Sequence, residues 1–410
     1  MSTGIFNSGQ ITQTLAKPSF AQMITRLMPN GTAPLFGMTS MLPSDTAVQT
    51  EHGFFTKTML FPQLTLSAAG QTAADTLFTV TSTLNILAGM IMRVDTTGEN
   101  LIINAVVSGT QVSVTRGLGS VSAAIIGASV NLYMVGNAYE EASIRPQSLI
   151  INPVRITNLT QIFRNTWAIS DSVRATMMLA GDTNVQESRQ DCAAFHAADI
   201  EKALFFGQKS QGSRNGQPFR TMDGLINIVQ NIAYYPSYFS AVNNNTAGAT
   251  TNYTQLEGFL DPVFNQATDP KVANERVLFV GGNAKRVINT IGRLNGTYYI
   301  VDGQTNYGLQ FSTFKTARGT FRMIEHPLFN SNTSWAKMAV AVDLSSFRVA
   351  YLGDRKTQNR EFNVPDGNDV DVSDNGIDAV GGTLTTEITC VVKNPPANSI
   401  VFNLTAAAAG

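Results

Sequence analysis

Residues 65–136 constrain the fold most, because they form a run of short strand-like segments with very few charges. Thr, Val, Ile and Gly dominate this part of the chain, and the turn signals LAG, TTG, VSG and GLGS separate its segments. The segments are TLFTVTS, MIMRVD, ENLIINAVV, TQVSVTRG and SVNLYMV. Five strands at roughly 10 to 15 residue spacing predict a small β-barrel or β-sandwich.

Two further strand signals flank this module, at 52–64 and at 146–169. In the first of them, successive side chains alternate between two faces, and both faces carry apolar residues. One face holds Phe55, Lys57, Met59 and Phe61, and the other holds Phe54, Thr58 and Leu60. We therefore expect a strand that is contacted on both sides. Because the two flanking segments can pair with each other, we predict that the module is inserted into a longer loop.

The clearest helix follows Gly181. Thr183 and Gln186 match the S/T-x-x-E/Q capping box, and Gly207 stands where a helix commonly ends. Between these signals, apolar residues recur at steps of four, three and four. This spacing predicts a buried helix face made of Ala193, Ala197, Ile200 and Leu204. We expect a helix over 183–206, about 35 Å long at about 1.5 Å per residue.

Helices and strands alternate in the second half of the chain. A capping box at Thr254 and Glu257 predicts a helix that Pro262 kinks or stops. The run VLFVGGNAKRVINTI predicts a buried strand, a glycine turn and a helix capped by Asn283. From Gly308 onward the chain returns to strands. This mixture is typical of an α/β or α+β domain, and with the separate strand-rich module we assign the chain to the α+β class.

Three segments are predicted to be irregular. Pro and Gly interrupt residues 1–50 at short intervals, which predicts an extended arm with at most one short helix near 20–27. The acidic stretch DGNDVDVSDNGID (366–378) lacks the closing Glu of an EF-hand, so we favour a solvated turn over a calcium site. The densest positive run is GDRKTQNR (353–360), for which we favour a solvated loop over a nucleic-acid contact.

Groups that could perform chemistry are few. The histidines His52, His196 and His326 are far apart in sequence, and one helix around His196 cannot complete a zinc site. The GGNAKR turn matches neither phosphate-binding pattern, and no G-x-S-x-G run occurs. Glu140 and Glu141 are adjacent, so on an extended chain they point apart and do not suit shared acid–base work. We therefore predict no catalysis, no cofactor and no metal.

The chain carries little charge: charged residues make up 14% of it, against roughly 25% in an average soluble domain. Neutral polar residues can be desolvated against a neighbour more easily than Lys or Glu, so we favour self-assembly over an ordinary β-rich globule. The net charge of -1 argues against a free-standing DNA-binding protein. Only Cys192 and Cys390 are present, and no signal-like segment or long apolar run occurs. We therefore expect synthesis in a reducing cytoplasm and no membrane association.

Four motifs follow one another through the middle of the chain. They are a segment containing Glu140 and Glu141, a T-N-x-T-Q-I-F-R strand at 157–164, a D-x-E-x-A-L-x-x-G helix at 199–207 and an R-T-M-D-G-L turn at 220–225. In this order and spacing they resemble the major capsid proteins of short-tailed double-stranded DNA bacteriophages with the HK97-like fold. A weaker likeness continues through VLFVGGNAKRVINTI, GTFRMIEHP and TEITCVVKN, so it covers roughly residues 135–400.

The resemblance implies a division of the chain that can be compared with the structure. It implies an N-arm at 1–50, E-loop legs at 51–64 and 137–169, an inserted β-module at 65–136, a P-domain at 170–224 and 336–410 with a spine helix at 183–206, and an A-domain at 225–335. The residues expected to contact other subunits are Phe55, Lys57, Met59, Phe61, Glu140, Glu141, Arg145, Arg155 and Arg164.

The implied function is the icosahedral head shell that encloses a phage genome. The expected partners are other copies in pentamers and hexamers, a portal, a separate scaffolding protein, an optional decoration protein and packaged double-stranded DNA on the inner face. One alternative is an encapsulin-like shell around protein cargo. In a different class stands a secreted β-rich hydrolase or adhesin, against which the missing signal-like segment and the missing acid pair count.

Overall fold

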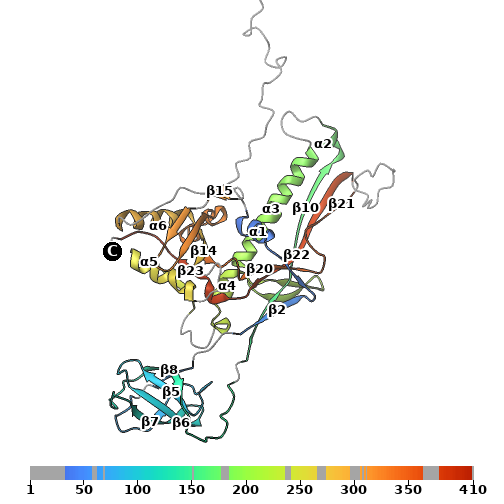
Figure 1. Cartoon of the computed structure of the whole chain (residues 1–410). Helices are drawn as coiled ribbons and strands as arrows, with labels where there is room; N and C mark the ends of the chain where they lie inside the picture. Colours follow the sequence, from blue (N-terminus) through green and yellow to red (C-terminus); the bar gives the residue numbers. More distant parts are fainter. Residues whose placement is uncertain are drawn as a thin grey trace, which may run out of the picture. The chain divides into compact units, whose positions relative to one another are not determined.

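The computed structural model describes residues 33–57, 62–67, 70–149, 152–176, 184–235, 242–265, 274–295, 305–306, 309–310, 312–362 and 378–408. The chain divides into two compact units, and Figure 1 labels some of their helices and strands. The first consists of Phe55–Ile156 with Ala233–Ala241, and the second of Met1–Phe54, Thr157–Ile232 and Val242–Gly410.

The first unit is built on a six-stranded antiparallel sheet. Its strands are β3 (Gln63–Thr65), β4 (Leu77–Thr79), β5 (Met90–Val94), β6 (Asn100–Ser108), β7 (Gln111–Leu118) and β8 (Asn131–Asn137), in the order β3-β8-β5-β6-β7-β4. The two outer strands also meet, because Leu66 bridges Val80 and the amide of Ser67 donates to the carbonyl of Thr79 at 2.9 Å. The sheet is therefore a closed barrel, the first of the two architectures that the sequence left open.

Alternating side chains fill the barrel. Buried members of its core include Met92, Val94, Leu101, Ile103, Val112 and Val114. A buried ion pair accompanies them, in which Arg116 Nη2 lies 2.6 Å from Glu99 Oε2. The amides of Gly117 and Ala124 also donate to this carboxylate, at 3.1 and 3.3 Å. Burial by itself would raise the pKa of Glu99, but the hydrogen bonds from Arg116 and the two amides outweigh it and hold that pKa below its ordinary value of 4.5.

A five-stranded sheet supports the long helix of the second unit. Its strands are β1 (Asp45–Ala47), β20 (Phe347–Leu352), β22 (Ala379–Val392) and β10 (Gln161–Ser170), in that order, with β21 (Gln358–Phe362) also paired to β22. All ten residues of β10 pair with β22. Helix α3 (Asn184–Phe206) runs alongside these two strands (Figure 1). Between them lies a buried cluster of Trp167, Cys192, Val380 and Leu384.

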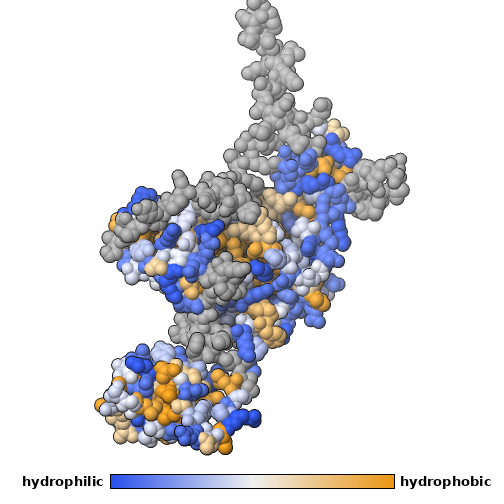
Figure 2. Space-filling model, viewed as in Figure 1, coloured by the Kyte–Doolittle hydropathy of each residue, from blue (hydrophilic) through white to orange (hydrophobic). Residues whose placement is uncertain are grey.

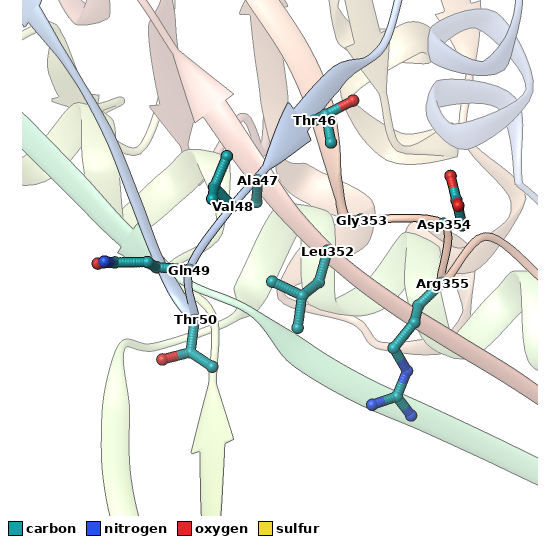
Figure 3. A pocket seen from close by; sticks show the side chains of 9 residues that line it. All are labelled: Thr46, Ala47, Val48, Gln49, Thr50, Leu352, Gly353, Asp354 and Arg355. Atoms are coloured by element: carbon teal, nitrogen blue, oxygen red, sulfur yellow. The ribbon is translucent and has the colours of Figure 1, made fainter.

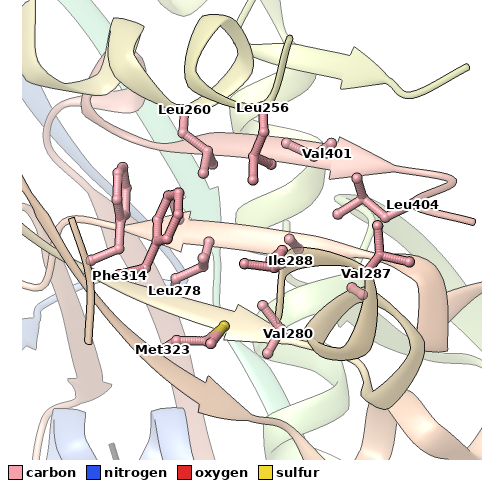
Figure 4. Close-up of a cluster of buried hydrophobic side chains, with 14 of the residues drawn as sticks. Leu256, Leu260, Leu278, Val280, Val287, Ile288, Phe314, Met323, Val401 and Leu404 are labelled. Atoms are coloured by element: carbon pink, nitrogen blue, oxygen red, sulfur yellow. The ribbon is translucent and has the colours of Figure 1, made fainter. Parts of the chain in front are cut away.

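A six-stranded sheet forms the rest of the second unit's core. Its strands are β13 (Asn244–Thr246), β23 (Ser399–Phe402), β19 (Ala339–Val342), β14 (Glu275–Val280), β18 (Thr320–Glu325) and β17 (Ser312–Lys315), in that order. The residues of β14 from Arg276 to Val280 are all buried, which is typical of a central strand covered on both faces. Helices α5 (Tyr253–Leu260) and α6 (Gly282–Asn295) supply apolar side chains to this core (Figure 4). The labelled members include Leu256, Leu260, Leu278, Val280, Val287 and Ile288.

Short elements connect these sheets. Two-stranded pairs are β2 (Glu51–Thr56) with β9 (Val154–Leu159), β11 (Ser210–Arg214) with β12 (Gln217–Thr221), and β15 (Thr305–Asn306) with β16 (Leu309–Gln310). Short α-helices are α1 (Pro34–Ser40), α2 (Asp171–Ala175) and α4 (Leu225–Gln230). The 3-10 turns are η2 (Ile232–Tyr234), η3 (Asp261–Asn265), η5 (Pro327–Ser331), η6 (Trp335–Lys337) and η7 (Pro395–Ala397). The predicted α+β class is confirmed.

Several local predictions differ from the structure or lie outside the described residues. The predicted arm of 1–50 contains α1, which Pro34 begins, because a first helical residue needs no amide donor. The helix expected near 20–27 and the cap at Thr183 lie outside the described residues. The run 353–360 was expected to be a loop, but its last three residues enter β21 through pairing with β22.

The cap of α5 was placed two residues too late. Asn252 begins this helix, its Oδ1 accepts from the Gln255 amide at 2.8 Å, and the Gln255 side chain accepts from the Asn252 amide at 3.2 Å. Asparagine is as strong a cap as threonine, so Thr254 with Glu257 was the wrong choice. The early stop expected at Pro262 is confirmed, since α5 ends at Leu260.

The glycine turn before α6 has a steric cause. A Cβ on Gly281 would lie 2.4 Å from the carbonyl oxygen of Ala336, so no larger residue fits. Asn283, expected to cap α6, lies inside its first turn, and its Oδ1 accepts from Arg286 instead.

Two predicted domain boundaries do not coincide with the sheets. Strands β19 and β23 lie beyond the expected A-domain limit at 335, yet they pair beside β14. Strand β10 falls in the expected loop leg 137–169, yet it pairs with β22 along its whole length. Both differences come from pairing between distant segments, which local patterns do not encode.

Candidate intersubunit surface

Three of the sequence motifs meet at one buried point. The side-chain amide of Asn158 donates to the carbonyls of Asp223 and Cys390, each at 2.9 Å, and its Oδ1 accepts from the Asp223 amide at 2.7 Å. The thiol of Cys390 donates to the same Asp223 carbonyl at 2.8 Å. Burial raises the pKa of this thiol well above its ordinary value, so it stays protonated as a donor. The strand, turn and C-terminal motifs are therefore one buried hydrogen-bonded unit.

The end of the spine helix joins this unit through two glycines. The amide of Gly224 donates to the carbonyl of Gly207 at 2.9 Å. A Cβ on Gly207 would lie 2.5 Å from the carbonyl oxygen of Met222, and a Cβ on Gly224 would lie 2.7 Å from that of Phe205. Only glycine allows the two backbones to approach this closely. The closing glycine of the helix motif and the glycine of R-T-M-D-G-L are thus required by one contact.

Glu387 of β22 binds the same motifs through its side chain. It is 1% exposed and accepts from Thr160 at 2.9 Å. Arg355 lies 2.8 Å from one of its oxygens, and Arg220 lies 3.5 Å from the other. A buried carboxylate needs such partners, because an unpaired buried charge would destabilise the fold by several kcal/mol, about 3 to 5 in measured cases.

The buried face of α3 differs from the expected one. Ile200 and Leu204 are fully buried and Ala197 is half-buried, but Ala193 is exposed, so its assignment to the core was wrong. Cys192 and His196 are buried on that face instead. A small residue such as alanine is found both inside and outside proteins, and therefore marks a buried face poorly.

His196 is held by the strands beneath the helix. Its Nδ1 lies 2.7 Å from Asn165 Oδ1 of β10, and its Nε2 lies 2.7 Å from Thr386 Oγ1 of β22. Burial lowers the pKa of His196 below its ordinary value of 6.5, although the nearby Asp199 carboxylate opposes this. The imidazole is thus neutral at pH 7 and crosslinks helix to sheet.

The expected contact residues of the first loop leg are only partly described. Phe55 at the end of β2 is 68% exposed, and Lys57 after it is exposed. Met59 and Phe61 lie outside the described residues. A single exposed apolar side chain is ordinary on a protein surface, so the exposure of Phe55 does not by itself mark a contact.

The second leg begins with a fully exposed stretch. Every residue from Asn137 to Leu149 is exposed, and residues 138–149 form neither helix nor strand. Glu140, Glu141 and Arg145 all lie in this stretch. Arg155, in β9, is exposed as well. The two glutamates therefore form an accessible acidic pair.

Arg164 lies on an open face of the five-stranded sheet. Along β10, Phe163 and Trp167 are buried, whereas Arg164 and Thr166 point to the opposite face. Thr166 pairs with Thr383 of β22, which in turn pairs with Arg360 of β21. Directly opposed residues share a face of a sheet, so Arg164 and Arg360 lie on the same face, one row apart.

This open face is positively charged. Both guanidinium groups are exposed, and within the described part of the chain neither has an ion-pair partner. The acid on the same face, Glu387, is buried and already bound by Arg355 and Arg220. Arg164 was among the expected contact residues, whereas Arg360 was expected to lie in a solvated loop. Only the pairing of β21 with β22 shows that the two share a face.

A shallow cavity of about 560 Å³ lies at the edge of the same sheet (Figure 3). The turn after β1 and the turn after β20 line it, through residues 46–50 and 352–355. Val48, at its rim, is 90% exposed. The lining offers Asp354 and Arg355 as its charged groups, and Arg355 is engaged by Glu387. The cavity has no arrangement of nucleophile, base and acid.

The barrel exposes apolar side chains as well, visible as orange surface in Figure 2. They include Leu84, Val107, Ile125 and Val135, each more than half exposed. Among the described residues, no group of three or more His, Cys, Asp or Glu side chains could hold a metal ion. No described helix is long and apolar enough to cross a membrane. The acidic run at 366–377 lies outside the described residues.

Comparison with known proteins identifies relatives along almost the whole chain. A family model described as SU10 major capsid protein matches residues 3–405. The major capsid protein of Pseudomonas phage PaMx41 is 37% identical over 407 residues, which cover 98% of this chain and 96% of that protein. The relationship therefore includes the barrel and both sheets.

Solved structures with a similar chain path include one from Mycobacterium phage Bobi, with 10% identity, a TM-score of 0.48 and coverage of 97% of this chain and 98% of that one. Another is the capsid of an empty GTA particle, with 10% identity, a TM-score of 0.46 and coverage of 98% and 100%. Family membership is shown by the family model and by the phage PaMx41 protein.

The family match favours the shell over the nanocompartment and over the secreted hydrolase or adhesin. The chain belongs to the SU10 major capsid protein family and is a structural subunit of a phage head shell.

Proposed function

We propose that subunits assemble as pentamers and hexamers in which the open sheet face of Arg164 and Arg360 receives the acidic pair Glu140–Glu141 of a neighbouring copy. The observation that carries the proposal is the presence of exposed, unpaired charges of both signs on one chain. Such a surface is complementary to a second copy of itself. Only 14% of the residues are charged, so exposed charges of opposite sign are few along this chain.

The energy of one such contact is small. An exposed ion pair typically contributes about 0 to 1 kcal/mol and is screened by salt. In a closed shell each subunit makes the same contacts with its neighbours, so modest pairs add up across many copies. The charged contact therefore aligns neighbouring subunits and keeps their association reversible. Phe55 and the apolar barrel surface supply the area that a neighbouring subunit buries.

The parts of the chain take the roles that the HK97-like arrangement gives them. Residues 1–50 form the N-arm, whose β1 joins the sheet of β20 and β22. Strands β2 and β9 belong to the extended loop, and the barrel is inserted into that loop in sequence. The sheet of β10 and β22 with α3 is the core of the P-domain. The sheet around β14 is the core of the A-domain, with β19 and β23 included.

Further partners follow from the role of a head shell. A portal and a separate scaffolding protein complete the assembly, a decoration protein is an optional addition, and packaged double-stranded DNA contacts the inner face without sequence preference. A net charge of -1 fits a wall that neither repels nor tightly binds this polyanion. The subunit is synthesised in the host cytoplasm and ends in the virion capsid.

The test compares matched arginine neutralisations in the full-length chain. Arg164→Gln with Arg360→Gln removes both unpaired charges, and Arg322→Gln removes an exposed arginine that is paired within its own subunit, 2.7 Å from Glu275. Sedimentation velocity and electron microscopy then measure the fraction of subunits in closed particles. We expect the double variant to assemble less and to be less sensitive to salt, and the Arg322 variant to match the wild type.

Charge reversal identifies the partner. Arg164→Glu alone and Glu140→Arg with Glu141→Arg should each reduce assembly, whereas all three changes in one chain should restore part of it. Equal assembly of the wild type and the double neutralised variant at every salt concentration would contradict the proposed contact. Loss without recovery in the triple variant would assign the arginines to another anionic partner.

A further inference from the structure

Two motif residues have a role that subunit contacts do not explain: Glu201 of the spine-helix motif and His326 of GTFRMIEHP. Both side chains are fully buried, and His326 Nε2 lies 2.8 Å from Glu201 Oε1. The same carboxylate accepts two backbone amides of α1, Leu35 at 2.8 Å and Phe36 at 2.7 Å. One carboxylate therefore connects three elements that are far apart in sequence.

The hydrogen bonds of the imidazole fix its proton. The amide of Leu328 donates to Nδ1 of His326 at 3.2 Å, so Nδ1 is an acceptor and the proton of the neutral ring is on Nε2. This proton points at Glu201. Three aromatic rings surround the imidazole, with Phe329 stacked at 4.3 Å and Phe205 and Phe279 edge-on at 5.0 and 5.8 Å. The carboxylate thus has three donors in an otherwise apolar setting, where losing one is costly.

Helix α1 depends on this carboxylate. It is only 7 residues long, and helices shorter than about 12 residues are marginal by themselves. Its N-cap residue, Ala33, has no side-chain acceptor for the free amides of the first turn. Glu201 supplies both oxygens in place of a cap, and its negative charge lies at the positive end of the helix. The only buried residues of α1 are Pro34, Leu35 and Thr39.

We propose that Glu201 and His326 form a latch that decides whether α1 is docked on the spine helix. The carboxylate holds the first turn of α1, and His326 is a positioning residue that orients the carboxylate. The latch thereby fixes the position of α1 on the second unit. Its consequence for assembly rests on the proposed function, in which α1 belongs to the N-arm that contacts neighbouring subunits.

Hydrogen exchange of unassembled full-length subunits, followed by mass spectrometry, tests the latch. Glu201→Gln presents an amide in place of one carboxylate oxygen, so we expect the amides of 35–41 to exchange at least tenfold faster while β22 and the barrel keep wild-type rates. His326→Phe removes the donor and should give a smaller increase in the same amides. Glu275→Gln is the control, since this exposed glutamate pairs with Arg322 away from α1.

Two outcomes separate the latch from the assembly proposal. If the amides of 35–41 exchange at the wild-type rate in Glu201→Gln, the latch is overturned, whether or not that variant forms shells. If that variant does not fold, Glu201→Asp keeps the charge but is one methylene shorter, and unchanged exchange there overturns the latch equally. Faster exchange of these amides in either variant supports the latch. This holds even if the wild type fails to form shells, a result that would contradict the proposed function.

Discussion

Asn158→Asp is the sharpest single perturbation of the motif junction. The change keeps the size of the side chain and the Oδ1 acceptor that binds the Asp223 amide at 2.7 Å. It replaces the donor that binds the carbonyls of Asp223 and Cys390, both at 2.9 Å, with an oxygen. Two buried hydrogen bonds at about 1 kcal/mol each are lost, and an unpaired carboxylate faces two carbonyls. We expect the second unit to lose about 3 to 5 kcal/mol of its free energy of unfolding.

Urea unfolding of unassembled subunits measures this loss through tryptophan fluorescence. Both tryptophans of the chain, Trp167 and Trp335, lie in the second unit, so the signal reports that unit and not the barrel. The control is Asn332→Asp, an exposed site whose Oδ1 accepts from Ser334, an acceptor that the change preserves. We expect the Asn158 variant to unfold at roughly 1 M less urea and the control to match the wild type. Equal midpoints for both variants would refute the junction as a source of stability.

Three further perturbations follow from the structure. Ile200→Asp should destabilise the second unit by several kcal/mol and lower its melting temperature. Ala193→Asp, on the exposed face of α3, should change the melting temperature little. A larger loss in the Ala193 variant than in the Ile200 variant would contradict the buried face described for α3. The pKa of Glu99 in the folded barrel lies below 4.5, so its ion pair stabilises the barrel fully above about pH 4.5. This stabilisation is lost as the pH falls through the folded pKa. Glu99→Gln should remove this acid sensitivity, which hydrogen exchange of β6 and β7, corrected for intrinsic rates, measures. Replacing residues 63–134 with two glycines should leave the unfolding monitored by tryptophan fluorescence unchanged. Gln63 pairs with Tyr133, so the two ends of the removed segment are adjacent. Loss of all soluble protein would contradict an inserted barrel.

Local sequence patterns predicted many of the helices and strands but not which distant strands pair with each other. The five strand segments of 65–136 were predicted because their alternation and turns are contained in short windows, and they correspond to β4 to β8. The sixth strand, β3, and the closing bridge at Leu66 depend on neighbours elsewhere in the chain. The pairing of β21 with β22 is likewise invisible in the run 353–360.

The buried polar groups were the hardest to foresee. Hydrophobic spacing assigned Ala193 to the core and passed over His196 and Glu201, because a buried polar residue is recognised only when its partners are known. Asn158 and Asp223 lie in two of the quoted motifs, but the order of the motifs does not show that these residues bind each other. Arg164 was named as a candidate contact residue, whereas its place beside Arg360 is visible only in the sheet register.

Electron microscopy of the purified recombinant chain in negative stain, over a range of protein concentrations, tests whether this chain builds shells from copies of itself. We predict closed icosahedral particles or their pentameric and hexameric parts at high concentration. A protein that stays monomeric at every concentration and salt condition, with its sheet face and loop uncovered, would contradict the account.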